Sequence, residues 1–244
     1  MNGKGGTGKT TIAALITARL AAEGKTSILA IDADPNSCFA DALGVHDAQT
    51  IVGICEDISR HMDTIPSGMT KDRFIEMRVQ ESLAEADAFD LLVMGRPEGP
   101  GCYCYVNSLL RDIIGRITKN YDFVIIDNAA GMEHISRRTT GQISRLVLVS
   151  DYSVAGVRST KKIYDLAMDL KIKIGSAYLI VNRVSGPLSV LKSDIEKTGL
   201  EVAGEVPYSK ELVRWSVSNK SIFEFKSKAV QHEIERIVDK LTEK

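Results

Sequence analysis

The sequence lacks three things that would mark common classes of protein: a long apolar run, a net charge and an excess of cysteine. No stretch approaches the roughly 18 apolar residues of a membrane-spanning helix, and no signal-peptide pattern opens the chain. Lys and Arg number 31 against 32 Asp and Glu, so the formal net charge is −1 and no global field attracts nucleic acid or an anionic membrane. These absences predict a cytoplasmic protein without a nucleic-acid or membrane partner.

The four cysteines are predicted to be thiols or metal ligands rather than disulfides, because disulfides are rare in cytoplasmic proteins. We expect Cys38 to be a small buried residue and Cys55 to be structural, whereas Cys102 and Cys104 form a close pair. With 244 residues, of which 44% are hydrophobic, the chain can bury a full core. We therefore expect one domain spanning residues 1–244.

Apolar segments of strand and helix character alternate along the chain, which predicts an α/β fold with a mostly parallel sheet and helices on both faces. The irregular section Ile51–Glu85 is predicted to be an insertion near the ligand face. Strands are expected at Thr26–Asp32, Asp90–Met94, Phe123–Asp127, Leu146–Ser150, Ala177–Asn182 and Glu201–Val206, and helices at Val106–Lys119, Thr160–Leu170, Leu188–Thr198 and Ala229–Leu241.

The first ten residues contain a phosphate-binding loop of the pattern G-x-x-x-x-G-K-[ST]. Its glycines let the backbone form a nest of N–H groups that point at phosphate oxygens. Lys9 would reach the β- and γ-phosphates, and the Thr10 hydroxyl would bind Mg²⁺. The predicted nucleotide-binding residues here are Gly3, Gly5, Gly6, Thr7, Gly8, Lys9, Thr10 and Thr11.

The position of this loop is unusual, because such loops normally follow a buried apolar strand. Only Met1 and Asn2 precede Gly3. Either the first strand is missing or the loop is anchored in another way. We favour a missing strand of roughly six residues, whose loss would leave a gap in the centre of the sheet.

Lys4 indicates a particular family of proteins with this loop. A second lysine early in the loop is the pattern of the deviant Walker A ATPases, which this chain resembles. The resemblance implies that the protein forms a homodimer on ATP and that Lys4 reaches the nucleotide of the opposite subunit. It also implies that Asp34, after the second strand, orients the attacking water. Asp127 fits the Walker B acid that holds Mg²⁺ through water, and Gly131 fits the switch II N–H at the γ-phosphate.

The base is predicted to be adenine. Asn182 and Arg183 lie at a strand end where the resembled family places an asparagine on the adenine ring, and Pro207 and Tyr208 resemble its segment along the base edge. A guanine-reading site usually has an acid at the position of Ser185. An asparagine that only caps the strand is the simpler alternative for Asn182.

Cys102 and Cys104 form a Cys-x-Cys pair that provides two thiolates for one soft metal ion. Tetrahedral Zn²⁺ and related sites require four ligands, and a two-fold dimer would bring together both pairs. Spacing alone is a weak signal, and two small half-buried residues are an equal alternative.

The segment around this pair, 99–104, and the segments 34–38 and 131–134 resemble the CooC-type accessory ATPases of carbon monoxide dehydrogenase and the related accessory proteins of acetyl-CoA synthase. The resemblance implies an ATP-dependent dimer that binds one Ni²⁺ or Zn²⁺ between its subunits at Cys102 and Cys104. It implies that the client is apo carbon monoxide dehydrogenase or acetyl-CoA synthase. His134, just past switch II, is either a solvated side chain or a relay of the nucleotide change to a partner.

Two other functions share the loop and switches. A regulatory ATPase of the MinD/ParA kind would carry a basic amphipathic membrane helix or a basic DNA-binding patch. Here the apolar positions Ile234, Ile237, Val238 and Leu241 are opposed by mixed charges, which predicts packing onto the body. A redox ATPase would bridge an iron–sulfur cluster with two well-separated cysteines per subunit, one close to switch II. The segment 127–133 has none.

Overall fold

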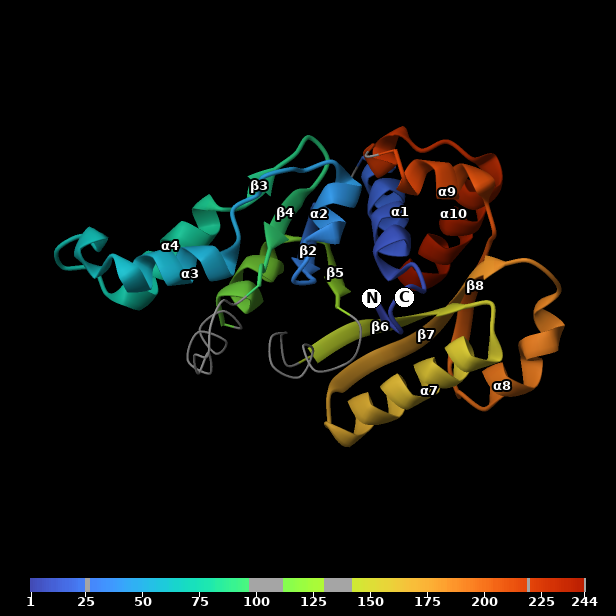
Figure 1. Cartoon of the computed structure of the whole chain (residues 1–244). Helices are drawn as coiled ribbons and strands as arrows, with labels where there is room; N and C mark the ends of the chain where they lie inside the picture. Colours follow the sequence, from blue (N-terminus) through green and yellow to red (C-terminus); the bar gives the residue numbers. More distant parts are fainter. Residues whose placement is uncertain (25–26, 97–111, 130–141, 219, 244) are drawn as a thin grey trace.

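The computed structural model describes residues 1–24, 27–96, 112–129, 142–218 and 220–243, and its elements alternate between strand and helix (Figure 1). The strands are β1 (Asn2–Gly3), β2 (Ile28–Ala33), β3 (Ala84–Glu85), β4 (Asp90–Val93), β5 (Phe123–Asn128), β6 (Gln142–Asp151), β7 (Lys173–Val184) and β8 (Glu201–Pro207). The helices are α1 (Lys9–Ala22), α2 (Cys38–Leu43), α3 (Ile51–Arg60), α4 (Lys71–Glu81), α7 (Val154–Asp169), α8 (Lys192–Glu196), α9 (Lys210–Ser216) and α10 (Lys228–Thr242). Residues 112–117 are also helical. Short 3₁₀ helices lie at Met62–Thr64, Thr118–Asn120, Leu188–Leu191 and Ile222–Glu224.

The strands form two four-stranded sheets, in the orders β3-β4-β2-β5 and β1-β6-β7-β8. Every pairing is parallel except that of β3 with β4. The predicted α/β class with a mostly parallel sheet is therefore confirmed. In the first sheet Asp32 lies opposite Asp127, so two acidic residues meet at the carboxyl edge.

The two sheets meet at the N-terminus, which lies between β5 and β6 (Figure 1). β1 has only two residues and pairs with β6, placing Asn2 opposite Leu148. On the other side, the amino group of Met1 donates to the Ile126 carbonyl and the Asn128 N–H donates to the Met1 carbonyl, at 3.3 Å. Within the described residues, β5 and β6 are not paired with each other upstream of these contacts, so the strands form two sheets rather than one.

Helices cover both faces of the sheets. The apolar face of α1 is buried through Ile12, Leu15, Ile16 and Leu20, in one core with β2, β6 and α10. α3 and α4 pack on the opposite face of β2 and β4 in a second core. The section Ile51–Glu85, predicted as an insertion near the ligand face, begins beside the carboxyl end of β4, where Thr50 forms a bridge with Val93. Its helices α3 and α4 form the layer that covers β2 and β4.

The C-terminal helix α10 buries its apolar face, as the sequence predicts. Ile234, Ile237 and Val238 belong to the core that α10 shares with α1. Among the described helices, none is long and apolar enough to cross a membrane. The first six residues of the predicted helix Val106–Lys119 lie outside the described residues, and residues 112–117 of its remainder are helical.

Close packing of α10 on β8 gives a test of the core. A Cβ on Gly204 would lie 2.4 Å from Ile237 Cγ1. Gly204→Ala should therefore lower the free energy of unfolding by about 1–3 kcal/mol through overpacking. In an Ile237→Ala background the colliding atoms are gone, and urea denaturation should reveal a coupling of roughly 0.5–3 kcal/mol between the two substitutions. Equal costs in both backgrounds would contradict this packing.

Candidate nucleotide site

The predicted phosphate loop folds between β1 and α1, and two of its glycines have left-handed backbone angles. Gly6 has φ 79°, and Gly8, which precedes the first residue of α1, has φ 90°. A Cβ on Gly8 would lie 2.3 Å from Asn182 Nδ2. Glycine at position 8 is thus required both by conformation and by the approach of Asn182.

The loop closes on the carbonyl oxygen of Lys4. The Thr7 hydroxyl donates to this oxygen at 3.0 Å, and Lys9 Nζ lies 3.4 Å from it. Lys9 is only 8% exposed, so its ammonium group is held inside the loop rather than in solvent. Lys4 itself is exposed, as are Gly5 and Gly6. The loop therefore combines the Lys9 ammonium group with backbone N–H groups at the N-terminus of α1. Both kinds of group bind the oxygens of a polyphosphate.

Thr10 and Asp127 meet at the carboxyl edge of β5. The Thr10 hydroxyl donates to Asp127 Oδ2 at 2.6 Å. Asp127 is fully buried, and burial raises the pKa of its carboxyl group, against the lowering effect of the Thr10 hydrogen bond and the nearby Met1 amino and Lys9 groups. The amino group of Met1 is buried beside it, which lowers the pKa of that group.

These residues fit a magnesium ion. Asp127 Oδ1 is buried and has no hydrogen-bond partner within the described residues, so one carboxylate oxygen is available next to the Thr10 hydroxyl. Carboxylate and hydroxyl oxygens are the ligands that Mg²⁺ prefers, together with phosphate oxygens and water. Thr10 and Asp127 would hold the ion, directly or through water.

Asp32 is a structural residue of the site that the sequence analysis did not single out. Its Oδ1 accepts from the Asp34 N–H at 3.0 Å, and its Oδ2 accepts from the N–H groups of Phe39 and Ala40 at 2.8 and 2.9 Å. Burial raises the pKa of this carboxyl group to about 6, although the three N–H groups oppose the shift. The carboxylate thereby folds the segment after β2 into a turn. In the sequence, the feature that could have indicated this role of Asp32 is its position two residues before Asp34.

Asp34 lies on that turn, half-buried and close enough to Asp127 for their charges to interact. Its carboxylate accepts from the Asn36 N–H at 2.8 Å. The structure thus brings the predicted water-orienting acid to the same edge as Lys9 and Asp127. The prediction for Cys38 is wrong: its side chain is exposed at the start of α2 because the turn directs it away from the core. Cys55 is buried in the second core, between α3 and the first sheet, which agrees with the structural role predicted for it.

Asn182 anchors the phosphate loop from β7. Its side chain is 2% exposed, its Nδ2 donates to the Thr7 carbonyl at 2.8 Å, and its Oδ1 accepts from the Arg183 N–H at 2.9 Å. This loop contact was not predicted, and the adenine contact of Asn182 stays a prediction. Arg183, at φ 59°, and Tyr208 are exposed at the adjoining strand ends, where Val184 pairs with Pro207.

Three predicted site residues, Cys102, Cys104 and Gly131, lie outside the described residues, as does His134. Within the described ranges, no group of three or more His, Cys, Asp or Glu side chains is arranged to hold a metal ion. The Cys-x-Cys metal site therefore stays a prediction.

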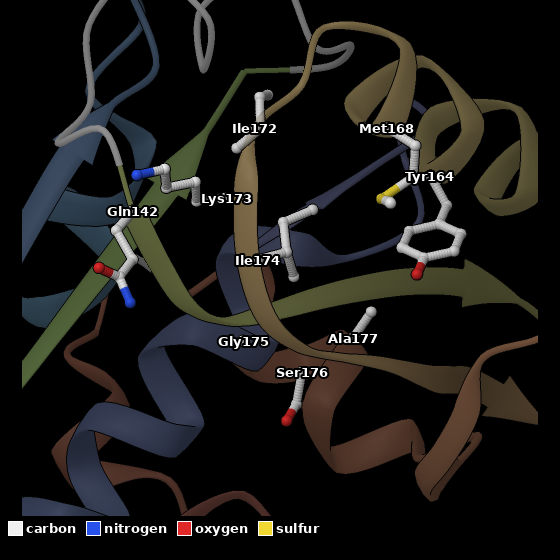
Figure 2. A pocket seen from close by; sticks show the side chains of 9 residues that line it. All are labelled: Gln142, Tyr164, Met168, Ile172, Lys173, Ile174, Gly175, Ser176 and Ala177. Carbon is white, nitrogen blue, oxygen red and sulfur yellow. The ribbon is translucent and has the colours of Figure 1, made fainter.

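A cavity of about 400 Å³ lies at the opposite end of the second sheet (Figure 2). It is lined by the first residues of β6 and β7, including Gln142 and Lys173, and by Tyr164 and Met168 of α7. Because the strands are parallel, their amino ends lie far along the sheet from the loop at the carboxyl edge. This cavity is therefore not part of the nucleotide site.

The anchoring role of Asn182 can be separated from a role in base recognition. Asn182→Ala removes the donor to the Thr7 carbonyl, so it should weaken binding of Mg·tripolyphosphate as well as Mg·ATP, each by roughly 5- to 20-fold, the value of one or two hydrogen bonds. Tyr208→Ala is the matched control and should affect only ATP. Isothermal titration calorimetry measures both ligands. Unchanged tripolyphosphate binding in Asn182→Ala would show that the anchor is not needed.

Comparison with known proteins agrees with this site. The chain is 38% identical over 248 residues to an uncharacterized ATP-binding protein of Methanocaldococcus jannaschii, covering 100% of this chain and 98% of the relative. It is 28% identical over 219 residues to the carbon monoxide dehydrogenase accessory protein CooC of Rhodospirillum rubrum, covering 85% and 82%. The solved structure of the MinD cell division protein of Aquifex aeolicus superposes with a TM-score of 0.70 at 19% identity, over 99% of this chain and 94% of that one, and so shares the fold.

Residues 1–222 match the model of the CobQ/CobB/MinD/ParA nucleotide binding domain. This match covers most of the chain, and it includes the loop, both acidic strand ends and Asn182. The chain therefore belongs to the CobQ/CobB/MinD/ParA family of nucleotide-binding proteins.

Proposed function

We propose that the protein is a Mg²⁺-dependent ATPase of the cytoplasm that hydrolyses ATP to ADP and phosphate. The observation that carries this proposal is the pairing of the Thr10 hydroxyl with a buried Asp127 carboxylate beside Lys9 in the loop. Bound Mg²⁺ would neutralise charge on the β- and γ-phosphates. Lys9 would bind the same phosphates, and the loop N–H groups would orient them.

Hydrolysis then needs a water molecule placed in line with the γ-phosphate. Asp34 is the residue for this role, because the turn organised by Asp32 holds its carboxylate near Asp127. Gly131 would donate its N–H to the γ-phosphate. We propose that the exposed Lys4 acts on the nucleotide of a second subunit in an ATP-bound homodimer. Positioning and charge stabilisation account for most of the catalysis of phosphoryl transfer.

We further propose that the protein is a metallochaperone that uses ATP turnover to deliver a metal ion. Cys102 and Cys104 of two subunits would together bind one Ni²⁺ or Zn²⁺, and the client would be apo carbon monoxide dehydrogenase or acetyl-CoA synthase. Support comes from the Cys-x-Cys pair and from the 28% identity to a carbon monoxide dehydrogenase accessory protein. Burial of the apolar face of α10 in the core leaves that face unavailable for binding a membrane.

The nucleotide chemistry can be tested with substitutions in the loop and the switch. Lys9→Ala should abolish tight Mg·ATP binding, whereas Asp34→Ala should bind Mg·ATP within a few fold of wild type and lose turnover by on the order of 100-fold or more. Lys192→Ala, at an exposed lysine of α8, is the matched control. Phosphate release and calorimetry give the two readouts. Equal affinity for ATP and GTP would contradict adenine selection.

The metal proposal predicts one ion per dimer. Anaerobic titration with Ni²⁺ or Zn²⁺, followed by size-exclusion chromatography with and without an ATP analogue, should show this stoichiometry. Cys102→Ser and Cys104→Ser should each abolish tight binding and leave the basal ATPase measurable, because each removes two of four thiolates. Cys38→Ser, at an exposed thiol, should change nothing.

One metal per monomer, or stoichiometric binding by either variant of the pair, would contradict the inter-subunit site. The cysteine thiols must lose their protons to bind a metal ion as thiolates, so the affinity for Ni²⁺ or Zn²⁺ should rise with pH. A brown iron–sulfur chromophore after anaerobic purification would support the redox alternative instead.

A further inference from the structure

The helix α2 follows the turn that carries Asp34, and its two ends are held by different parts of the chain. At its first turn, the Asp32 carboxylate accepts from two backbone N–H groups. At its last residue, the Leu43 carbonyl accepts from the Ser221 hydroxyl at 2.9 Å. The last carbonyls of a helix have no partner inside the helix. Ser221 therefore supplies a hydrogen bond that α2 cannot make for itself.

The end of α2 lies directly against Ser221. Gly44, which follows the last residue of the helix, has a left-handed φ of 83°. A Cβ on Gly44 would lie 2.7 Å from Ser221 Cβ, so glycine is required there both by conformation and by this close approach. Leu43 is buried in the core around α1. The contact between α2 and Ser221 is therefore tightly packed as well as hydrogen-bonded.

Ser221 itself is fixed to the body of the protein. Ile222, the next residue, is 2% exposed and belongs to the core around α1. The ring of Phe223 stacks on that of Phe89, with centroids 5.5 Å apart and planes at 5°. The Ser221 carbonyl accepts from Trp215 Nε1 of α9 at 3.2 Å. The end of α2 is thus attached to a rigid support.

We propose that Ser221 is a positioning residue for phosphoryl transfer, which fixes the Asp34 carboxylate by holding the far end of α2. The inference rests on the proposed ATPase function. The Ser221 hydroxyl holds the Leu43 carbonyl at one end of α2. At the other end, the first turn of the helix holds the Asp32 carboxylate, which accepts from the Asp34 N–H at 3.0 Å. Phosphoryl transfer depends on the positioning of such groups, so a less firmly held α2 slows it.

The test removes the Ser221 hydroxyl and keeps its Cβ. Ser221→Ala should lower kcat for Mg·ATP roughly 5- to 20-fold, the value of one or two hydrogen bonds that position a reacting group. The loop that would bind the phosphates is not part of this path of contacts. KM and the calorimetric affinity for Mg·ATP should therefore stay within about 2-fold of the wild-type values.

Ser82→Ala is the matched control. The Ser82 hydroxyl donates to the Val79 carbonyl at 2.7 Å, at the end of α4 and beside the edge strand β3. It makes the same kind of bond away from the nucleotide site. Each variant should lower the midpoint of thermal unfolding by about 2–4 °C, the shift expected for one lost hydrogen bond in a chain of this size. Only Ser221→Ala should slow turnover.

Amide hydrogen exchange without nucleotide gives a second readout, which does not depend on ATP hydrolysis. The N–H groups of α2 should exchange roughly 5-fold faster in Ser221→Ala and at the wild-type rate in Ser82→Ala. Unchanged exchange in α2, a wild-type kcat in Ser221→Ala or equal slowing in both variants would overturn the proposal. Absence of turnover in the wild type would instead contradict the proposed function and, with it, this role of Ser221.

Discussion

The hydrogen bond between the Thr10 hydroxyl and the Asp127 carboxylate joins the two halves of the molecule at the point where nucleotide chemistry would take place. Thr10 lies in the first turn of α1, after the loop that leaves β1, whereas Asp127 lies near the end of the β5 strand of the other sheet. Few backbone contacts cross between the sheets there, all of them through Met1 among the described residues. The site thus lies at a junction that the loop, its short strand and the shared core around α1 maintain.

Residues from three strand ends position the loop and its acids. Asn182 holds the Thr7 carbonyl from β7, Asp32 organises the turn that carries Asp34, and Asp127 comes from β5. These contacts use buried amide and carboxylate groups whose partners are mostly backbone atoms. A loop fixed in this way can present its N–H groups to phosphate without reorganising, which favours charge stabilisation during transfer.

Much of the fold was predictable because apolar strands such as 123–126 and amphipathic helices such as α10 carry strong periodic signals. The loop residues were predictable from spacing, and both acids from the resemblance of their segments to the switches of the deviant Walker A ATPases. The longer extents of β6 and β7 were not, because their first residues are polar or exposed and resemble loop. α7 begins at Val154 rather than Thr160, since Ser153 caps it by accepting from the Gly156 N–H.

Long-range geometry accounts for the other misses. The bond from Asn182 to Thr7 joins residues 175 positions apart, and no local pattern shows it. Cysteine is a small residue type that is commonly buried, yet the turn formed around Asp32 leaves the Cys38 side chain exposed. The short helix α9 has no fully buried residue, and its apolar side chains Leu212 and Trp215 are only partly buried against the first core. In each case tertiary contacts decide the outcome.

We expect Mg·ATP to bind in the loop between Lys9, Thr10 and Asp127. The most direct test is a crystal structure with Mg²⁺ and a non-hydrolysable ATP analogue. The account predicts Mg²⁺ bound by the Thr10 hydroxyl, Asp127 holding it through water, and Lys9 Nζ within hydrogen-bond distance of the β- and γ-phosphates. Phosphates bound away from the loop, or a metal ion that contacts neither Thr10 nor a water held by Asp127, would contradict it.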